Sequence, residues 1–208
     1  ARSLPRQKRM LYDAGLKVPM IIRFPNKHKA GTIDDRLISF VDFAPTILEL
    51  TGQTIPKYLQ GFSFKGNDEN GRKYIHAAAD RFDGVTDVIR AVRDGRFKYL
   101  RNYRPEQGYY LPVTYREQIP TMQELLRMRE VGELNEVQAQ WFRTSKPKEE
   151  LFDCLNDPNE LINLADKPEY AAKLLELRIE MDRWIVEIGD QPNLPERKLV
   201  NHLWRGAA

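Results

Sequence analysis

The dipeptide Asp94-Gly95 lies between two runs rich in β-branched and aromatic residues, and it restricts the fold of this chain more than any other local feature. Asp-Gly readily adopts the positive φ angles of a type I′ turn, which joins the strands of a two-residue hairpin. Residues 87–93 and 96–103 are therefore predicted to pair as a β-hairpin. An antiparallel sheet is expected in this part of the chain.

Helices are predicted from apolar periodicity and from residues that favour helix ends. Residues 39–52 read as a helix, with Asp42 as its N-cap and Gly52 as its C′ residue. A strand is predicted for residues 150–154, and the most amphipathic helix follows it near the end of the chain. We interpret the apolar stripe of that helix as core; it comprises Tyr170, Leu174, Leu177, Met181, Trp184 and Ile188.

Residues 8–25 combine a basic loop, a glycine turn and a short apolar run. Residues 18–22 are long enough for a strand and too short for a helix of normal size. Pro19 suits the first residues of a strand, where a missing N–H is tolerated. A strand that follows a loop carrying Lys8 and Arg9 would place cations at the mouth of a sheet, where anionic ligands are commonly held.

Positive charge is concentrated at the start of the chain, although the net charge of the whole chain is only +3. Within residues 1–30 the one acidic side chain is Asp13, and the basic ones are Arg2, Arg6, Lys8, Arg9, Lys17, Arg23, Lys27 and Lys29. Such a patch points to an anionic partner. Nucleic acid is one candidate; a sulfated or phosphorylated small molecule is the other, and the strand predicted after the patch favours it. No apolar run is long enough to span a bilayer.

A second group of candidate ligands, His76, Asp80 and Arg81, is predicted at the end of a strand over residues 73–79 and in the loop after it. Carboxylates accept hydrogen bonds from hydroxyls, and an arginine fork binds sulfate or carboxylate, so this mixture suits a polar sugar. The same side chains could equally pair with one another in a surface network, and that alternative stays open.

Several segments, in the same order along the chain, resemble type I sulfatases of the alkaline phosphatase superfamily. The first contains Lys8-x3-Tyr12-Asp-x-Gly15-Leu-Lys-Val-Pro, and the full set is 8–25, 39–48, 59–64, 89–103 and 150–165. The Tyr- and Pro-rich loop 104–120 and the helical segment 121–142 are similar to heparan N-sulfatase (sulfamidase)-like members and to related sulfatases directed at glycosaminoglycans.

The resemblance implies a role for Lys8, which corresponds to the lysine that contacts the substrate sulfate in this family. We therefore predict Lys8 as the catalytic residue of this chain and as a substrate-binding residue, together with His76, Asp80 and Arg81. A fixed ammonium group stabilises the charge that spreads over the sulfuryl oxygens in the transition state.

The resemblance also implies cofactors that this chain does not supply. Sulfatases convert a Cys or Ser within Cys/Ser-x-Pro-x-Arg into formylglycine, and Cys154, the one cysteine, lies in the different context Cys154-Leu-Asn-Asp-Pro. The family's Ca²⁺ ligands all precede the position that matches Lys8. No metal ligands are predicted here, and residues 67–70, whose composition would suit a hard cation, are interpreted as a turn.

The predicted fold class is α/β: the C-terminal part of a sulfatase or alkaline-phosphatase-like fold, with a small α+β domain made of an antiparallel sheet and packed helices. Residues 1–64 are expected to end the large α/β domain with the basic loop, a strand and a helix. Residues 65–190 are expected to form the α+β subdomain, and residues 191–208 a tail. The family suggests a periplasmic, secreted or lysosomal location, and the sequence does not decide among these.

The predicted function is that of the C-terminal segment of a sulfatase that hydrolyses a sulfate ester or an N-sulfate of a sulfated sugar. Its expected partners are the substrate and the N-terminal part of the same enzyme, with homo-oligomerisation left open and no nucleic acid or membrane span. Because the resemblance assigns formylglycine and Ca²⁺ to the N-terminal part, the segment is expected to be inactive alone.

Two alternatives are kept. The first is a phosphodiesterase or phosphomonoesterase of the same superfamily, which an upstream Thr or Ser nucleophile in place of formylglycine would reveal. The second is a non-catalytic module that binds polyanions through residues 1–30. Binding to heparin or DNA with a steep salt dependence, unchanged by Lys8→Ala, would favour the second alternative.

Overall fold

The computed structural model describes residues 5–66, 71–82 and 84–204, and it divides the chain into two compact units. We call residues 1–17, 76–92 and 97–208 the sheet unit, and residues 18–75 with 93–96 the α2 unit. The turn predicted at residues 67–70 lies outside the described residues. The division predicted at residues 64 and 190 stays a prediction.

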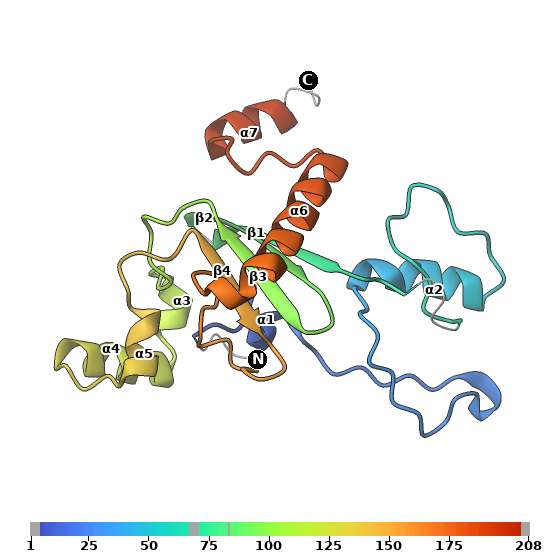
Figure 1. Cartoon of the computed structure of the whole chain (residues 1–208), viewed down its shortest axis with the longest axis horizontal. Helices are drawn as coiled ribbons and strands as arrows, with labels where there is room; N and C mark the ends of the chain where they lie inside the picture. The colour runs from blue at the N-terminus through green and yellow to red at the C-terminus, as the bar shows by residue number, and fades with distance from the viewer. Residues whose placement is uncertain (1–4, 67–70, 83, 205–208) are drawn as a thin grey trace. The chain divides into compact units, whose positions relative to one another are not determined.

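A four-stranded sheet with the order β1-β2-β3-β4 is the centre of the sheet unit (Figure 1). The strands are β1 (Ile75–Phe82), β2 (Val85–Arg93), β3 (Phe97–Asn102) and β4 (Glu149–Asp153). Strands β3 and β4 pair antiparallel, with Lys98 opposite Phe152 and Tyr99 opposite Leu151. The prediction of an antiparallel sheet combined with helices is confirmed.

The hairpin predicted around Asp94-Gly95 is present, because β2 and β3 are neighbours in the sheet, but the predicted turn type is wrong. Neither Asp94 nor Gly95 is among the residues with positive φ, which a type I′ turn requires at both positions. The Asp94 carboxylate instead accepts a hydrogen bond from the backbone N–H of Arg96 at 2.7 Å. Aspartate often closes a turn through its own side chain in this way.

The helices match the sequence periodicity over most of the chain (Figure 1). They are α1 (Asp13–Leu16), α2 (Phe43–Leu50), α3 (Thr114–Glu117), α4 (Pro120–Glu130), α5 (Glu136–Trp141), α6 (Ala171–Ile188) and α7 (Glu196–Trp204), with short 3-10 turns at Pro25–Lys27, Phe40–Asp42 and Pro168–Tyr170. Helix α7 lies within the segment predicted as a tail. No helix of the described part of the chain combines the length and the apolar character that crossing a bilayer demands.

Helix α6 lies against the sheet and contacts β3. Its predicted apolar stripe is buried at Leu174, Leu177 and Met181 but not at its end, where Ile188 is 42% exposed. The interpretation of the stripe as core is therefore confirmed for the middle of the helix. The helix ends at Gly189, whose φ of 65° is the left-handed conformation that glycine adopts without strain.

A second layer of core joins the start of the chain to the sheet. Met10, Leu11 and Tyr12 are each 3% exposed and belong to one apolar cluster with Leu100 of β3 and Phe152 of β4. The cluster is completed by Phe82, Ile89, Ala91, Leu111, Met122, Trp141 and Cys154. The segment that precedes α1 is thus part of the core of the sheet unit, although it is far from the sheet in sequence.

In the α2 unit the strand predicted at residues 18–22 is wrong: these residues have no regular secondary structure, and Ile21 is 98% exposed. A strand is stable only when its backbone groups pair with a neighbour, and the sheet of the described residues consists of β1 to β4 alone. Residues 18–22 are therefore apolar enough to be buried, but no described part of the chain covers them.

The helix predicted at residues 39–52 is present as a 3-10 turn followed by α2, and Gly52 takes the left-handed φ of 72° expected at C′. Asp42 stands at the N-cap position of α2, but its side chain does not cap that helix. Its carboxylate accepts the backbone N–H groups of Ser39 and Phe62 at 2.8 Å and pairs with Arg72 at 2.5 Å. Asp42 therefore ties three separate segments of the α2 unit together.

Leu177→Ala should destabilise the sheet unit, whereas Leu175→Ala on the same helix should not. Leu177 of α6 is fully buried, whereas Leu175 of the same helix is 55% exposed. Truncating a buried leucine costs about 2–5 kcal/mol, and surface changes usually stay within about 0.5 kcal/mol. Urea unfolding curves of the two variants measure the difference. Equal losses would show that α6 is not packed as described.

Candidate substrate-binding site

Lys8 lies in the loop that precedes α1, and its side chain is exposed. Its ammonium nitrogen is 5.8 Å from the centre of the Tyr115 ring, and the guanidinium carbon of Arg9 is 5.5 Å from the same ring. Both distances fall within the range of cation–π attraction. Helix α3 therefore supplies an aromatic surface beside two cations, which is an arrangement suited to an anionic ligand.

The backbone of this loop is held in an unusual conformation on both sides of Lys8. Arg6 has φ of 62° and Arg9 has φ of 75°, a left-handed region that non-glycine residues adopt only where the surroundings impose it. Gly15 is close to the loop: a Cβ at that position would lie 2.3 Å from the Met10 carbonyl oxygen and 2.6 Å from that of Gln7. The loop is therefore packed against the chain that follows it.

Tyr12 anchors the loop to the sheet through Glu150 of β4. The Tyr12 hydroxyl donates to one Glu150 carboxylate oxygen at 2.9 Å, and Asn102 Nδ2 donates to the other at 2.7 Å. Burial raises the pKa of the Glu150 carboxyl above its ordinary value, and the hydrogen bonds from Asn102 and Tyr12 oppose that shift. Burial also raises the pKa of Tyr12, so its phenol stays protonated and remains a donor.

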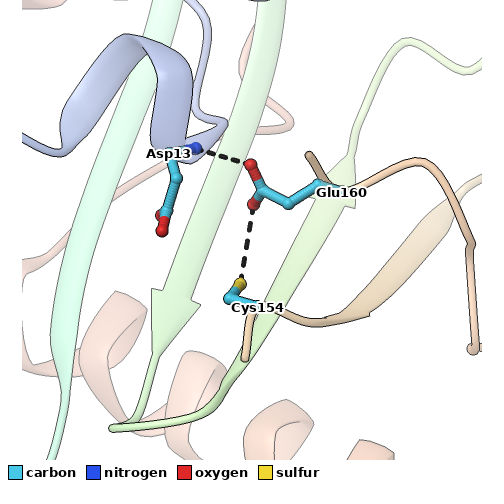
Figure 2. Close-up of side chains that lie close together, drawn as sticks. All are labelled: Asp13, Cys154 and Glu160. Atoms are coloured by element: carbon cyan, nitrogen blue, oxygen red, sulfur yellow. Dashed lines mark hydrogen bonds between the residues drawn. The ribbon is translucent and has the colours of Figure 1, made fainter. Parts of the chain in front are cut away.

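A buried ion-pair cluster lies beside α1, where Figure 2 shows Asp13, Cys154 and Glu160. Lys98 Nζ is 2.5 Å from Asp13 and 2.8 Å from Glu160, and the Asp13 backbone N–H donates to Glu160 at 2.6 Å. The ligand atoms of Asp13, Cys154 and Glu160 lie within 4.8 Å of one another, a spacing that a metal ion could use. The ammonium of Lys98 already contacts both carboxylates in the place that a cation would take, so the geometry gives no argument for a metal here.

Of the other predicted ligands, His76 lies in a strand as predicted, but Asp80 and Arg81 do not lie in a loop after it, because β1 continues through Phe82. Alternation along a strand puts His76 and Asp80 on one face and Arg81 on the other. The three side chains therefore do not converge as neighbouring residues of one loop would.

Each of these three side chains has a partner within the sheet unit. His76 Nε2 lies 2.9 Å from Glu180 of α6, and its ring stacks on Trp184 at 4.7 Å. Asp80 accepts a hydrogen bond from Arg90 at 2.6 Å, while Arg81 pairs with Glu196 of α7; these partners come from β2 and from helices near the end of the chain. The contacts correspond to the network that the sequence left open as an alternative, and contact with substrate stays a prediction.

Sequence reasoning did not single out Tyr115, Lys98 or Glu160. Tyr115 belonged to a loop whose tyrosines and prolines were noted together, and Lys98 appeared as an ordinary hairpin residue. Glu160 follows Asp157-Pro158 in a turn, where an exposed glutamate is normal. Only the long-range contacts reveal that Glu160 is buried.

A cavity of about 210 Å³ adjoins the loop. Its walls include Arg6, Tyr12, Tyr109, Trp141, Phe142 and Glu150. The indole nitrogen of Trp141 is buried there without a hydrogen-bond partner. Aromatic, aliphatic, amide and charged side chains all line the cavity, and the exposed ammonium of Lys8 is not among them.

A comparison with solved structures bears on the fold. The chain is similar to the structure of a 2-O GAG sulfatase, with a TM-score of 0.52 at 23% identity, over 76% of this chain and 27% of that one. At that level of identity the likeness shows the fold. The fold is that of the C-terminal part of a sulfatase, as predicted.

A family model described as N-sulphoglucosamine sulphohydrolase, C-terminal, matches residues 6–136. The chain belongs to this family, which confirms the predicted resemblance. It is 66% identical over 205 residues to an ulvan-active sulfatase of Formosa agariphila, covering 98% of this chain and 34% of that protein. It is 25% identical to human N-sulphoglucosamine sulphohydrolase, covering 89% of this chain and 40% of that protein. The chain thus spans about a third of the length of the curated relatives it matches.

The raised pKa of Glu150 predicts a stability difference that depends on pH. The folded state keeps the Glu150 proton at pH values where the unfolded chain, with a pKa near 4.5, has lost it. This contribution to stability is therefore greatest below the unfolded pKa and falls as pH rises through the raised folded pKa.

Glu150→Gln cannot ionise and should gain stability relative to the wild type between pH 5 and pH 8. Urea unfolding of both proteins at pH 5 and pH 8 gives the difference between their free energies of unfolding at each pH. The titration of all other groups cancels in that difference. A difference that is constant, or that moves in favour of the wild type as pH rises, would contradict the burial of an ionisable Glu150.

Proposed function

We propose that this chain is the C-terminal part of a sulfatase that removes sulfate from a sulfated sugar and that needs an upstream part for activity. Membership of the sulfatase family supports the proposal, as do relatives named ulvan-active sulfatase and N-acetylglucosamine-6-O-sulfatase. The observation that carries it is the exposed ammonium of Lys8 on a loop that continues into Met10, Leu11 and Tyr12, which are buried in the sheet unit.

In this proposal Lys8 binds the sulfuryl oxygens of the substrate. Charge on these oxygens and on the leaving oxygen grows toward the transition state, so a fixed cation stabilises that state more than the ground state. Arg9 and the ring of Tyr115 lie beside it and help to define an anion-binding surface. A sulfate monoester keeps its negative charge at neutral pH, which matches this surface.

His76, Asp80 and Arg81 are retained as the finer part of the proposal, in which they contact the sugar. To do so, Asp80 would share its carboxylate with Arg90, and Arg81 would leave or share Glu196. Arg81 is the most accessible of the three, with a side chain that is 56% exposed. It is therefore the first of the three to test for an effect on substrate affinity.

The residues of this chain do not fit the nucleophile or the metal of a sulfatase. Cys154 is buried and its thiol donates to Glu160, and it lies outside the Cys/Ser-x-Pro-x-Arg pattern. In the one described cluster with metal-ligand spacing, the Lys98 ammonium already contacts both carboxylates. We therefore assign formylglycine and Ca²⁺ to the upstream part and assign no chemical step on them to this chain.

The α2 unit offers a surface for that upstream part. Its large apolar side chains are widely exposed, and they include Val18, Met20, Ile21, Ile22, Ile33, Phe40, Val41, Ile47, Tyr58 and Phe62. Exposed apolar surface on this scale marks an interaction site. Because this chain spans about a third of its relatives, the polypeptide that precedes it is the partner we propose.

Lys8→Ala in the full-length enzyme should lower kcat for sulfate release from ulvan oligosaccharides by about 10²–10³-fold, the usual effect of removing one preorganised charge-stabilising group. The matched control is Lys17→Ala, which removes an exposed cation at the end of residues 1–17, the first segment of the sheet unit. This change should leave kcat within about twofold. Ion chromatography of released sulfate measures the rates. Equal effects of the two variants would remove Lys8 from the proposed site.

The 208-residue chain by itself should release no sulfate from the same oligosaccharides, because the nucleophile is assigned to the upstream part. Full-length enzyme at the same concentration is the positive control. Sulfate release by the isolated chain would show that it holds a nucleophile of its own and would overturn this division of roles.

A further inference from the structure

The loop that carries Lys8 is held at both ends by hydrogen bonds to one residue, Glu160. Before Lys8, Arg6 Nη2 donates to the backbone carbonyl oxygen of Glu160 at 2.5 Å. After it, the backbone N–H of Asp13 donates to the Glu160 carboxylate at 2.6 Å, as Figure 2 shows. The first and the last residue of the segment 6–13 thus both hydrogen-bond to Glu160, which lies about 150 positions further along the sequence.

Glu160 is itself fixed to the sheet. Its side chain is 1% exposed and accepts from Lys98 of β3 at 2.8 Å, and the Cys154 thiol approaches the same oxygen at 3.8 Å. Its backbone N–H donates to the Asp157 carbonyl at 3.0 Å, and its φ of 54° lies in the left-handed region. A non-glycine residue keeps such a conformation where neighbouring contacts impose it.

From these contacts we propose that Glu160 is a positioning residue for Lys8. The inference depends on the role of Lys8 proposed above. Lys8 is the exposed member of a loop whose two ends are held by one buried residue, and that residue is bonded to the sheet through Lys98. Glu160 thereby fixes where the ammonium stands relative to the sheet unit without contacting substrate.

The size of the expected effect follows from geometry. A displacement of about 1 Å in a group that orients or stabilises the reacting atoms can lower the rate about 10²-fold. Loosening either end of the 6–13 loop would allow Lys8 to sample several positions, of which few match the sulfuryl oxygens. The loss should fall mainly on kcat, because an interaction specific to the transition state is the one that is weakened.

The test compares two isosteric changes that each remove one charge from a buried lysine pair in the full-length enzyme. Glu160→Gln removes one of the two charges opposite Lys98, whose ammonium stays 2.5 Å from Asp13, and Asp87→Asn removes the charge 2.8 Å from Lys146, which is also buried. The Asp87–Lys146 pair makes none of the described contacts to residues 6–13. Both variants should lower the midpoint of thermal unfolding, and Asp87→Asn should lower it at least as much, because it takes from Lys146 the carboxylate that pairs with it, whereas Lys98 keeps Asp13.

Only Glu160→Gln should affect the loop and the reaction. Hydrogen exchange at the Asp13 amide, whose acceptor is Glu160, should become at least about tenfold faster, whereas Asp87→Asn should leave it unchanged. With ulvan oligosaccharides, kcat of Glu160→Gln should fall about 10–100-fold with KM within about threefold. Asp87→Asn should keep kcat within about twofold.

A double variant tests whether Glu160 acts through Lys8. If it does, adding Glu160→Gln to Lys8→Ala should cause no further loss of kcat beyond about twofold, because the positioned group is already absent. Arg6→Met loosens the other end of the loop without adding a charge imbalance beside Lys98, and it should repeat the kcat loss. This variant keeps the test decisive if Glu160→Gln does not fold.

The failure of this inference differs from the failure of the proposed function. If Lys8→Ala lowers kcat but Glu160→Gln and Arg6→Met behave as Asp87→Asn does, the positioning role is overturned and the role of Lys8 stands. If Lys8→Ala leaves kcat unchanged, the proposed function of Lys8 fails. Unchanged Asp13 exchange in Glu160→Gln would overturn the closure of the loop in either case.

Discussion

The buried cluster of Lys98, Asp13 and Glu160 is the interaction on which the organisation of the sheet unit depends. The ammonium of Lys98, near the start of β3, meets the carboxylate of Asp13 near the start of the chain and that of Glu160 in the turn after β4, and both distances are within 2.8 Å. Buried charges are tolerated only when each has its partners, because their desolvation is otherwise uncompensated. Losing Lys98 would leave two neighbouring carboxylates without the cation between them, so this one ammonium holds the start of the chain and the turn after β4 to the sheet together.

This constraint explains how an exposed lysine can have a defined position. Long side chains at a surface lose considerable entropy when they are fixed, and exposed ion pairs contribute little to stability. The precision must therefore come from the backbone beneath Lys8. Burial of Met10, Leu11 and Tyr12 fixes that backbone from one side, and the left-handed conformations of Arg6 and Arg9 show that packing overrides local preference there. Among the described residues of the α2 unit, none provides a comparable anchor for residues 18–22, which are mostly apolar and exposed.

The sequence predicted the elements whose causes are local. The β2–β3 hairpin and helix α6 follow from turn residues and periodicity within short windows, and both were predicted correctly. The strand at residues 18–22 failed because a strand requires a neighbour that the described residues do not contain. The predicted turn type was wrong because the Asp94 carboxylate accepts the backbone N–H of Arg96, a side-chain contact that the preference of Asp-Gly for type I′ turns does not take into account. Lys8 came from family resemblance, whereas Glu160 could not be found from sequence, since its role exists only through contacts about 150 residues away.

The boundary between the two units falls between Lys17 and Val18, and its position matters for the candidate site. Sequence reasoning joined the basic loop and the apolar run into one feature, a strand that brings cations to a sheet edge. The structure separates them: the loop takes its anchors from β3, β4 and the turn after β4, all inside the sheet unit. The anchors of the loop that carries Lys8 therefore lie between residues 97 and 160. If Lys8 binds sulfate as proposed, a change in β3 or in the turn at Glu160 should affect its position more directly than a change in the residues that follow it in sequence.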